Sequence, residues 1–175
     1  MTNFVTISDL ANYRLISDSV KNATMWPMCV QEAQHFDVRP WLGDALMNEI
    51  DEQLTTSPTS LSTANAALMN GGTYTVDGVN YIFQGLKACI IYYAFARFTT
   101  RAPFNYTAAG ITVKDTDFST PASDKSLQRL TTQEYLNATT LRDEVRQFLS
   151  RNSTDYPLYK GTGQTRPRTF QVIGD

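Results

Sequence analysis

The run from 84 to 101 constrains the fold more than any other part of this chain, because apolar side chains fall on nearly every face of it. A helix that is apolar all round lies in the middle of a protein or in a membrane. Lys87 and Arg97 interrupt the run, so no apolar stretch reaches the roughly 18 residues that a bilayer span needs. The sequence therefore predicts a central buried helix at about 84–101. Its two apolar stripes are Leu86, Ile90, Tyr93 and Ala94, and Cys89, Tyr92, Phe95 and Ala96.

Length and composition favour a single ordered globular body. The chain has 175 residues, of which 42% are hydrophobic and 18% are charged, and such a chain buries a sizeable core. The formal net charge is −2, and the basic residues are scattered. Proteins that bind duplex DNA electrostatically carry a basic stripe, so a direct grip on DNA is disfavoured. The N-terminus has neither the basic nor the apolar region of a signal peptide, and no membrane partner is expected.

The remaining helices are predicted from helical spacing, and they make the fold mainly α: a small helical bundle around the central helix. Helices are expected to begin near Ser8, Met25, Pro40 and Ala64. The last long helix is expected to begin at Ser123 or Ser126 and to end near Arg151. The second helix should bury Cys29, Val30, Ala33 and Phe36. The last should bury Leu127, Leu130, Ala138, Leu141, Val145 and Phe148, with Glu134 of the same stripe facing solvent.

A β-hairpin is predicted at about 73–82. Asp77-Gly78 suits the positive backbone dihedrals of a two-residue type I′ turn. An isolated hairpin is marginal in water, so its apolar face should lie on the helices or on a neighbouring subunit. The register places Val76 opposite Val79 and Tyr74 opposite Tyr81 on that face.

Catalytic and metal-binding patterns are lacking in the sequence. His35 is the single histidine, and Glu32 and Asp37 stand too close to it in sequence to complete a triad. Cys29 and Cys89 have no paired metal-ligand spacing, and both are expected to be buried, reduced thiols. We therefore predict that the chain is not an enzyme and uses no metal and no cofactor. A small enzyme acting through His35 is the rival reading.

Long extended loops and a polar tail set the predicted domain boundaries, which are a helical domain at 1–159 and an extended C-terminal tail at 160–175. The loop from 103 to 123 is long for a compact domain, and such loops are usually functional or disordered. Within it, 111–114 alternates like a short strand. Loop aromatics are expected to contact neighbours, although folding back on their own helices is the alternative. These aromatics are Phe104, Tyr106, Phe118, Tyr156 and Tyr159.

The order of several short segments resembles the head–tail connector proteins of tailed bacteriophages, also called adaptor or head-completion proteins, including those of crAss-like and related phages. The resemblance covers most of residues 7–159. It is carried by Ile7-Ser8-Asp9-Leu10, Glu32-Ala33-Gln34, Arg39-Pro40, Gly85-Leu86-Lys87, Tyr92-Tyr93-Ala94, Ala96-Arg97, Gly110-Ile111-Thr112-Val113-Lys114 and Tyr156-Pro157-Leu158-Tyr159.

The resemblance implies a structural virion protein without catalytic residues. Such proteins form a ring of roughly a dozen copies, closed by a head-to-tail interface, that joins the portal to the tail or neck around the DNA exit channel. The implied partners are further copies of the chain, the portal protein and downstream neck proteins, with DNA only passing through. The implied location is the head–tail junction of the virion, after assembly in the host cytoplasm.

Two sets of residues are candidates for these contacts. The expected inter-subunit residues are Pro103, Phe104, Ile111, Thr112, Val113 and Lys114. The expected residues for docking on the portal or an adjacent ring are Tyr156, Pro157, Leu158, Tyr159, Arg166 and Arg168, although the two arginines could equally be free solvated charges. The alternative function is a DNA-packaging or regulatory helical protein that binds nucleic acid through a basic face.

Overall fold

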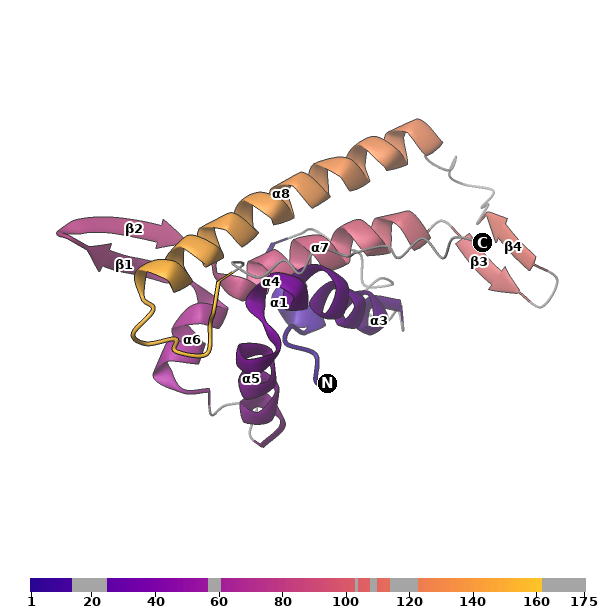
Figure 1. Ribbon diagram of the computed structural model, residues 1–175. Coiled ribbons are helices and arrows are strands. Elements are labelled where there is room, and N and C mark those ends of the chain that lie inside the picture. Colours follow the sequence, from indigo (N-terminus) through magenta and orange to yellow (C-terminus); the bar gives the residue numbers. More distant parts are fainter. Residues whose placement is uncertain (14–24, 57–60, 103, 108–109, 114–122, 162–175) are drawn as a thin grey trace, which may run out of the picture.

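A mainly α fold is confirmed by the computed structural model, which describes residues 1–13, 25–56, 61–102, 104–107, 110–113 and 123–161 (Figure 1). One helical segment, η1, is a π-helix. In chain order the elements are α1 (Ile7–Ala11), α3 (Met25–Glu32), η1 (Ala33–Val38), α4 (Arg39–Leu42), α5 (Asp44–Thr56), α6 (Thr63–Asn70), β1 (Gly72–Val76), β2 (Val79–Phe83), α7 (Gly85–Arg101), β3 (Phe104–Thr107), β4 (Gly110–Val113) and α8 (Asp124–Arg151).

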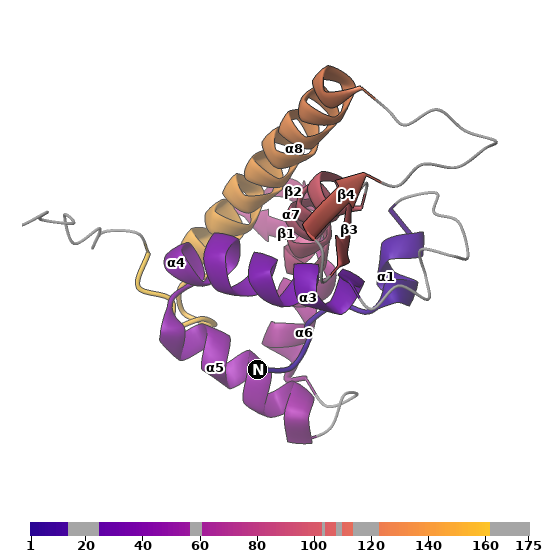
Figure 2. The same ribbon diagram turned by 90° about the vertical axis from the view of Figure 1, so that its right-hand side faces the viewer.

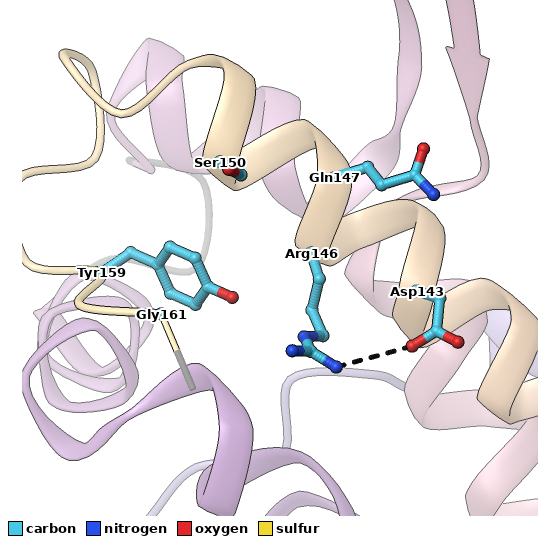
Figure 3. Close-up of a pocket in the computed structure, with 6 residues that line it drawn as sticks. All are labelled: Asp143, Arg146, Gln147, Ser150, Tyr159 and Gly161. Atoms are coloured by element: carbon cyan, nitrogen blue, oxygen red, sulfur yellow. Dashed lines mark ion pairs between the residues drawn. The ribbon is translucent and has the colours of Figure 1, made fainter. Parts of the chain in front are cut away.

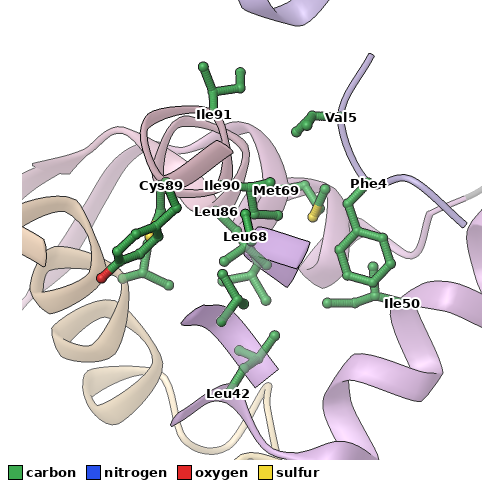
Figure 4. Packing of buried hydrophobic residues seen from close by; sticks show 14 of the residues in the cluster. Phe4, Val5, Leu42, Ile50, Leu68, Met69, Leu86, Cys89, Ile90 and Ile91 are labelled. Carbon is green, nitrogen blue, oxygen red and sulfur yellow. The ribbon is translucent and has the colours of Figure 1, made fainter. Parts of the chain in front are cut away.

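The predicted central helix is α7, and it is buried by helices on several sides. Ten of its seventeen residues are buried. The buried residues come from both predicted apolar stripes, because neighbouring helices cover more than one face of α7. Helix α8 packs along one side of α7, and α3, η1, α6 and α1 pack on the others (Figures 1 and 2). Each fully buried leucine or isoleucine contributes about 1.5–3 kcal/mol. Cys29 and Cys89 are buried and free, as predicted. The cluster in Figure 4 includes Phe4, Leu42, Ile50, Leu68, Met69, Leu86 and Ile90.

The hairpin β1–β2 has the predicted turn and register. Asp77 and Gly78 have φ values of 52° and 78°, as a type I′ turn requires. Tyr74 pairs with Tyr81, and their rings stack at 5.4 Å. The Tyr74 ring also meets the ring of Phe148 on α8 at 5.0 Å, so the hairpin lies on a helix of its own chain.

The chain enters and leaves this hairpin at one point, where Gly71 and Gly85 touch. Gly71 ends α6 with a φ of 74°, and Gly85 begins α7 with a φ of 83°. A Cβ atom on Gly71 would stand 2.5 Å from Gln84 C, and one on Gly85 would meet Gly71 N even more closely. Only glycine fits at both positions, because each combines a left-handed conformation with backbone contact.

The predicted inner face of the second helix is confirmed for Cys29, Val30 and Ala33, but the π-helix η1 removes Phe36 from it. Phe36 was expected to be buried and is 59% exposed, whereas Gln34 and Val38 are buried. A π-turn contains more residues than an α-turn, so it shifts every following side chain around the helix axis. Gln34 bonds the N-terminal segment, with its Oε1 accepting from Phe4 N at 2.8 Å and its Nε2 donating to Thr2 O at 2.9 Å.

Helix α8 begins at the predicted cap, but two predictions about its face are wrong. Ser123 accepts a hydrogen bond from Ser126 N and caps the helix. Leu130 was expected to be buried and is 43% exposed, because it lies in the N-terminal part of α8 where little else packs on the helix. Glu134 was expected to face solvent and is only 6% exposed. Its place in the stripe that faces α7 decides its burial, because helical spacing fixes direction whatever the polarity of the side chain.

A second hairpin, β3–β4, lies at the far end of α7 from β1–β2 (Figure 1). Phe104 pairs with Val113, and Thr107 pairs with Gly110. The sequence predicted only the strand near 111–114. The partner strand was missed, although aromatic and polar residues alternate along Phe104-Asn105-Tyr106-Thr107.

Replacing Gly85 by alanine should lower the free energy of unfolding by about 3 kcal/mol or more, since the new Cβ meets backbone and φ is positive. Gly43→Ala is the matched control, because Gly43 has a φ of 89° with open space around it and should lose only about 1–2 kcal/mol. Urea unfolding of both variants measures the difference. Equal losses would contradict a close approach of Gly71 and Gly85.

Candidate functional site

Four charged side chains join α7 to α3 and η1. Arg97 donates from Nε to Asp37 Oδ2 at 2.8 Å and from Nη2 to Asp37 Oδ1 at 3.0 Å. Arg101 Nη1 donates to Glu32 Oε1 at 2.8 Å. Hydrogen bonding to Asp37 raises the pKa of Arg97, and hydrogen bonding to Glu32 raises that of Arg101. Both carboxylates are thus paired with arginines that stay charged, which suits a structural role rather than acid–base catalysis. We call these four residues, Arg97, Arg101, Asp37 and Glu32, the α7 charge cluster.

The nucleophile candidates are held in unreactive states. Burial raises the pKa of both Cys29 and Cys89, so both thiols stay protonated and are poor nucleophiles. His35 is exposed, and its Nδ1 lies 3.5 Å from Arg39 Nη1. A cation beside an imidazole does not orient it as a base. Within the described ranges, no three His, Cys, Asp or Glu side chains are grouped so that they could hold a metal ion.

A polar hollow of about 550 Å³ lies where the chain passes back along α8 (Figure 3). Arg146 Nη1 lies 3.7 Å from Asp143 Oδ1, and Arg142 Nη2 lies 2.9 Å from the same oxygen. The charges of the hollow therefore compensate one another. It is lined by Asp143, Arg146, Gln147, Ser150, Tyr159 and Gly161.

A second concavity, of about 420 Å³, lies between α6, the base of the first hairpin and the C-terminal end of α8; we name it the hairpin groove. Its walls are aromatic. Phe83 stacks on Phe148 at 4.1 Å, and Tyr156 meets Phe148 edge-on at 5.5 Å. Asp155 is the one acidic residue that lines it. The lining consists of Thr63, Ala64, Ala67, Gly71, Gly72, Thr73, Tyr74, Phe83, Phe148, Asn152, Asp155 and Tyr156.

Tyr156 was predicted to dock on the portal or an adjacent ring, and its position argues against that role. The side chain is 3% exposed, and its hydroxyl donates to Ala64 O at 2.5 Å. Tyr156 therefore anchors the chain after α8 to its own α6. Pro157 and Leu158 are exposed, and Tyr159 is half-buried against the core, so these three stay candidates for docking.

The predicted inter-subunit residues gather on one hairpin, with Phe104 in β3 and Ile111, Thr112 and Val113 in β4. The pairing of Phe104 with Val113 brings the two ends of this set together. The other predicted residues lie outside the described residues, and these are Pro103, Lys114, Arg166 and Arg168.

Exposed apolar side chains mark further surfaces that sequence reasoning missed, among them one on the first hairpin and one on α8. Ile82 is 76% exposed on the face of β2 away from Tyr81, and Val79 is exposed at the turn. Leu136 is 56% exposed on the side of α8 away from α7. The signal was available, since Leu136 is an apolar residue outside the inner stripe of α8.

Residues 38–169 match a family described as a family of unknown function (DUF6712). This chain belongs to the DUF6712 family. The matched range includes both hairpins, α7 and α8. No curated protein and no solved structure matches the chain.

In the part of the chain that the structure describes, no helix has the length and apolarity to span a bilayer.

Asp37→Ala should lower the free energy of unfolding by about 3 kcal/mol, because Arg97 would keep a partly buried charge without its bidentate partner. Asp44→Ala is the matched control. Asp44 pairs with Arg39 at the surface, so its loss should change stability by less than about 1 kcal/mol. Chemical denaturation of both variants measures the two losses of stability. Equal losses would contradict a structural role for the α7 charge cluster.

Tyr156→Phe should lower the free energy of unfolding by about 1 kcal/mol at pH 8, because a buried hydrogen bond is lost. Burial raises the pKa of Tyr156 to about 12 from its ordinary value of 10. The folded chain therefore favours the neutral phenol, and its stability falls as pH rises from 10 to 12. Tyr156→Phe removes part of this alkaline loss. Urea unfolding at pH 8 and pH 11 measures it, and an unchanged pH dependence would contradict the assignment.

Proposed function

We propose that this chain is a structural virion protein, a subunit of an oligomeric adaptor ring that joins the portal to the tail or neck. In this proposal the ring surrounds the DNA exit channel at the head–tail junction and is assembled in the host cytoplasm. Its partners are further copies of the chain, the portal protein and downstream neck proteins, and DNA passes without a specific grip. The role requires no catalysis and no cofactor.

The observation that carries the proposal is that exposed apolar side chains lie on separated surfaces, of which those around Ile82 and Leu136 are the two that we assign to the contact. A ring needs a heterologous interface, in which one patch meets a different patch on the next copy. Ile82 lies on β2 beside Phe83, whose ring stacks on Phe148 near the C-terminal end of α8. Leu136 lies fifteen residues before that end, which is about 22 Å along the helix. One chain thus offers both halves of a head-to-tail contact.

The charge arrangement favours the ring over the alternative of a nucleic-acid-binding protein. Several basic side chains of the described surface are paired with acids of the same chain, which leaves less charge for phosphate. Lys87 Nζ lies 3.4 Å from Asp9 Oδ1. The other such pairs are Arg39 with Asp44, Arg97 with Asp37, Arg101 with Glu32 and Arg142 with Asp143.

Native mass spectrometry and electron microscopy of the purified chain, alone and with the portal protein of the same virion, test the proposal. Closed rings are expected. Ile82→Asp and Leu136→Asp should each weaken assembly by roughly 30-fold, because about 2 kcal/mol of apolar burial is lost per contact. Met28→Asp, a similar change on α3, is the control and should assemble normally. A chain that stays monomeric even with portal present would sink the proposal.

A further inference from the structure

We propose that the hairpin groove binds the basic C-terminal segment of a second copy of this chain, through Arg166 and Arg168 of that copy. The inference rests on the proposed self-association and names one contact that would link neighbouring copies. It assigns a ligand class, a guanidinium-bearing peptide, to a concavity of which the predicted interfaces included only Tyr156.

The walls of the groove are suited to a guanidinium. Arginine stacks on aromatic faces, and the attraction grows where water is excluded. Phe83, Phe148 and Tyr156 are nearly buried, so they form a rigid floor rather than open stacking faces, and the partly exposed ring available to a ligand is that of Tyr74. Tyr74 completes the lining from the hairpin side.

The charges around the groove also favour a cation. Asp155 is exposed and has no ion-pair partner among the residues that the structure describes, and no lysine or arginine lines the groove. Helix α8 ends here at Asn152, and a helix C-terminus carries partial negative charge. An aromatic wall, a free carboxylate and a helix C-terminus therefore favour the same class of ligand.

The same hairpin already binds one guanidinium of its own chain. Arg151 lies over the Tyr81 ring with its Cζ 3.9 Å from the centroid, and its Nη1 donates to Tyr74 Oη at 3.1 Å. Arg151 does not line the groove, so it leaves Asp155 open to a second cation. Its contact shows that the tyrosines of this sheet accept arginine stacking.

The path of the described chain favours a second copy as the source of the arginines. Gly161 lines the polar hollow with Asp143, Arg146, Gln147 and Ser150, as Figure 3 shows. Successive helical residues turn by about 100°, so this side of α8 lies about half a turn from Phe148 and Asn152, which face the groove. The chain thus leaves α8 on the side opposite its own groove. Fourteen residues follow Gly161, with a reach of at most about 50 Å, which is enough to arrive at a neighbour and also enough to pass around α8, so the mixture of two variants decides between them.

The C-terminal segment leaves α8 on one side and the hairpin groove lies on the other, so a contact between them joins two copies head-to-tail. Each copy gives its segment to one neighbour and receives a segment from the other, so repeated contacts form a ring or a filament. The inference thus agrees with the geometry that the apolar surfaces require, but it rests on different residues.

A labelled peptide tests the groove directly. The probe is a synthetic peptide of residues 162–175 with an N-terminal fluorophore. The receptor is the full chain carrying R166Q and R168Q, so that its own segment does not compete. Anisotropy at low salt should show saturable binding that weakens as salt rises. Asp155→Asn in the receptor should weaken it about fivefold. Asp143→Asn, the same change in the polar hollow, should leave it within about twofold.

Three results would overturn the inference: no binding at about 1 mM peptide, no loss with Asp155→Asn, or equal binding by a peptide that carries R166Q and R168Q. Mixing two full-length variants tests the second copy. D155R keeps an intact segment, and R166D/R168D keeps an intact groove. Each should associate more weakly alone than in a one-to-one mixture. If the mixture associates no more strongly than either variant alone, any such contact forms within one copy.

The outcomes separate this inference from the proposed function. If the wild-type chain forms rings and D155R forms them equally well, the groove contact is wrong and the adaptor ring stands. If the peptide binds as described but the wild-type chain never assembles with or without portal, the groove contact stands and the adaptor ring is wrong.

Discussion

The burial of α7 from several sides is the constraint on which the rest of the structure depends. Because most of its residues are buried, each neighbouring helix must present an apolar face to it. Its charged residues then need partners at the edges of the core. Lys87 meets Asp9 of α1, and Arg97 and Arg101 meet acids of η1 and α3. Asp9, Glu32 and Asp37 thus each pair with a basic side chain of α7.

Local patterns predicted the parts of the fold that local physics determines. The Asp77-Gly78 turn fixed the register of the first hairpin, and apolar spacing located α7 and α8. The burial of Glu134 shows that spacing outweighs side-chain polarity when one helix lies along another. The π-turn that exposes Phe36 was not predicted, because helical spacing assumes a regular α-helix, whereas Pro40 has no N–H to donate to the carbonyl of Phe36.

The candidate site was less accessible to sequence reasoning, since it joins residues far apart in the chain. Tyr156 belongs to an apolar-looking loop segment, and only its hydrogen bond to Ala64, ninety-two positions earlier, shows that it closes on its own domain. The hairpin groove likewise combines α6, the hairpin base and the end of α8. The arginine-bearing segment was noted from the sequence, but the groove that we propose for it exists only in the tertiary structure.

The contact between Gly71 and Gly85 has a consequence for how this chain could be modified or could diverge. A segment whose two ends touch can change in length without altering the distance that the surrounding chain must span. Tyr74 and Phe83 fix the base of the hairpin on α8, while Asp77, Gly78 and Val79 at the turn are exposed. Reporter peptides, longer tips or foreign recognition loops could therefore be grafted at this turn while α6 and α7 keep their positions.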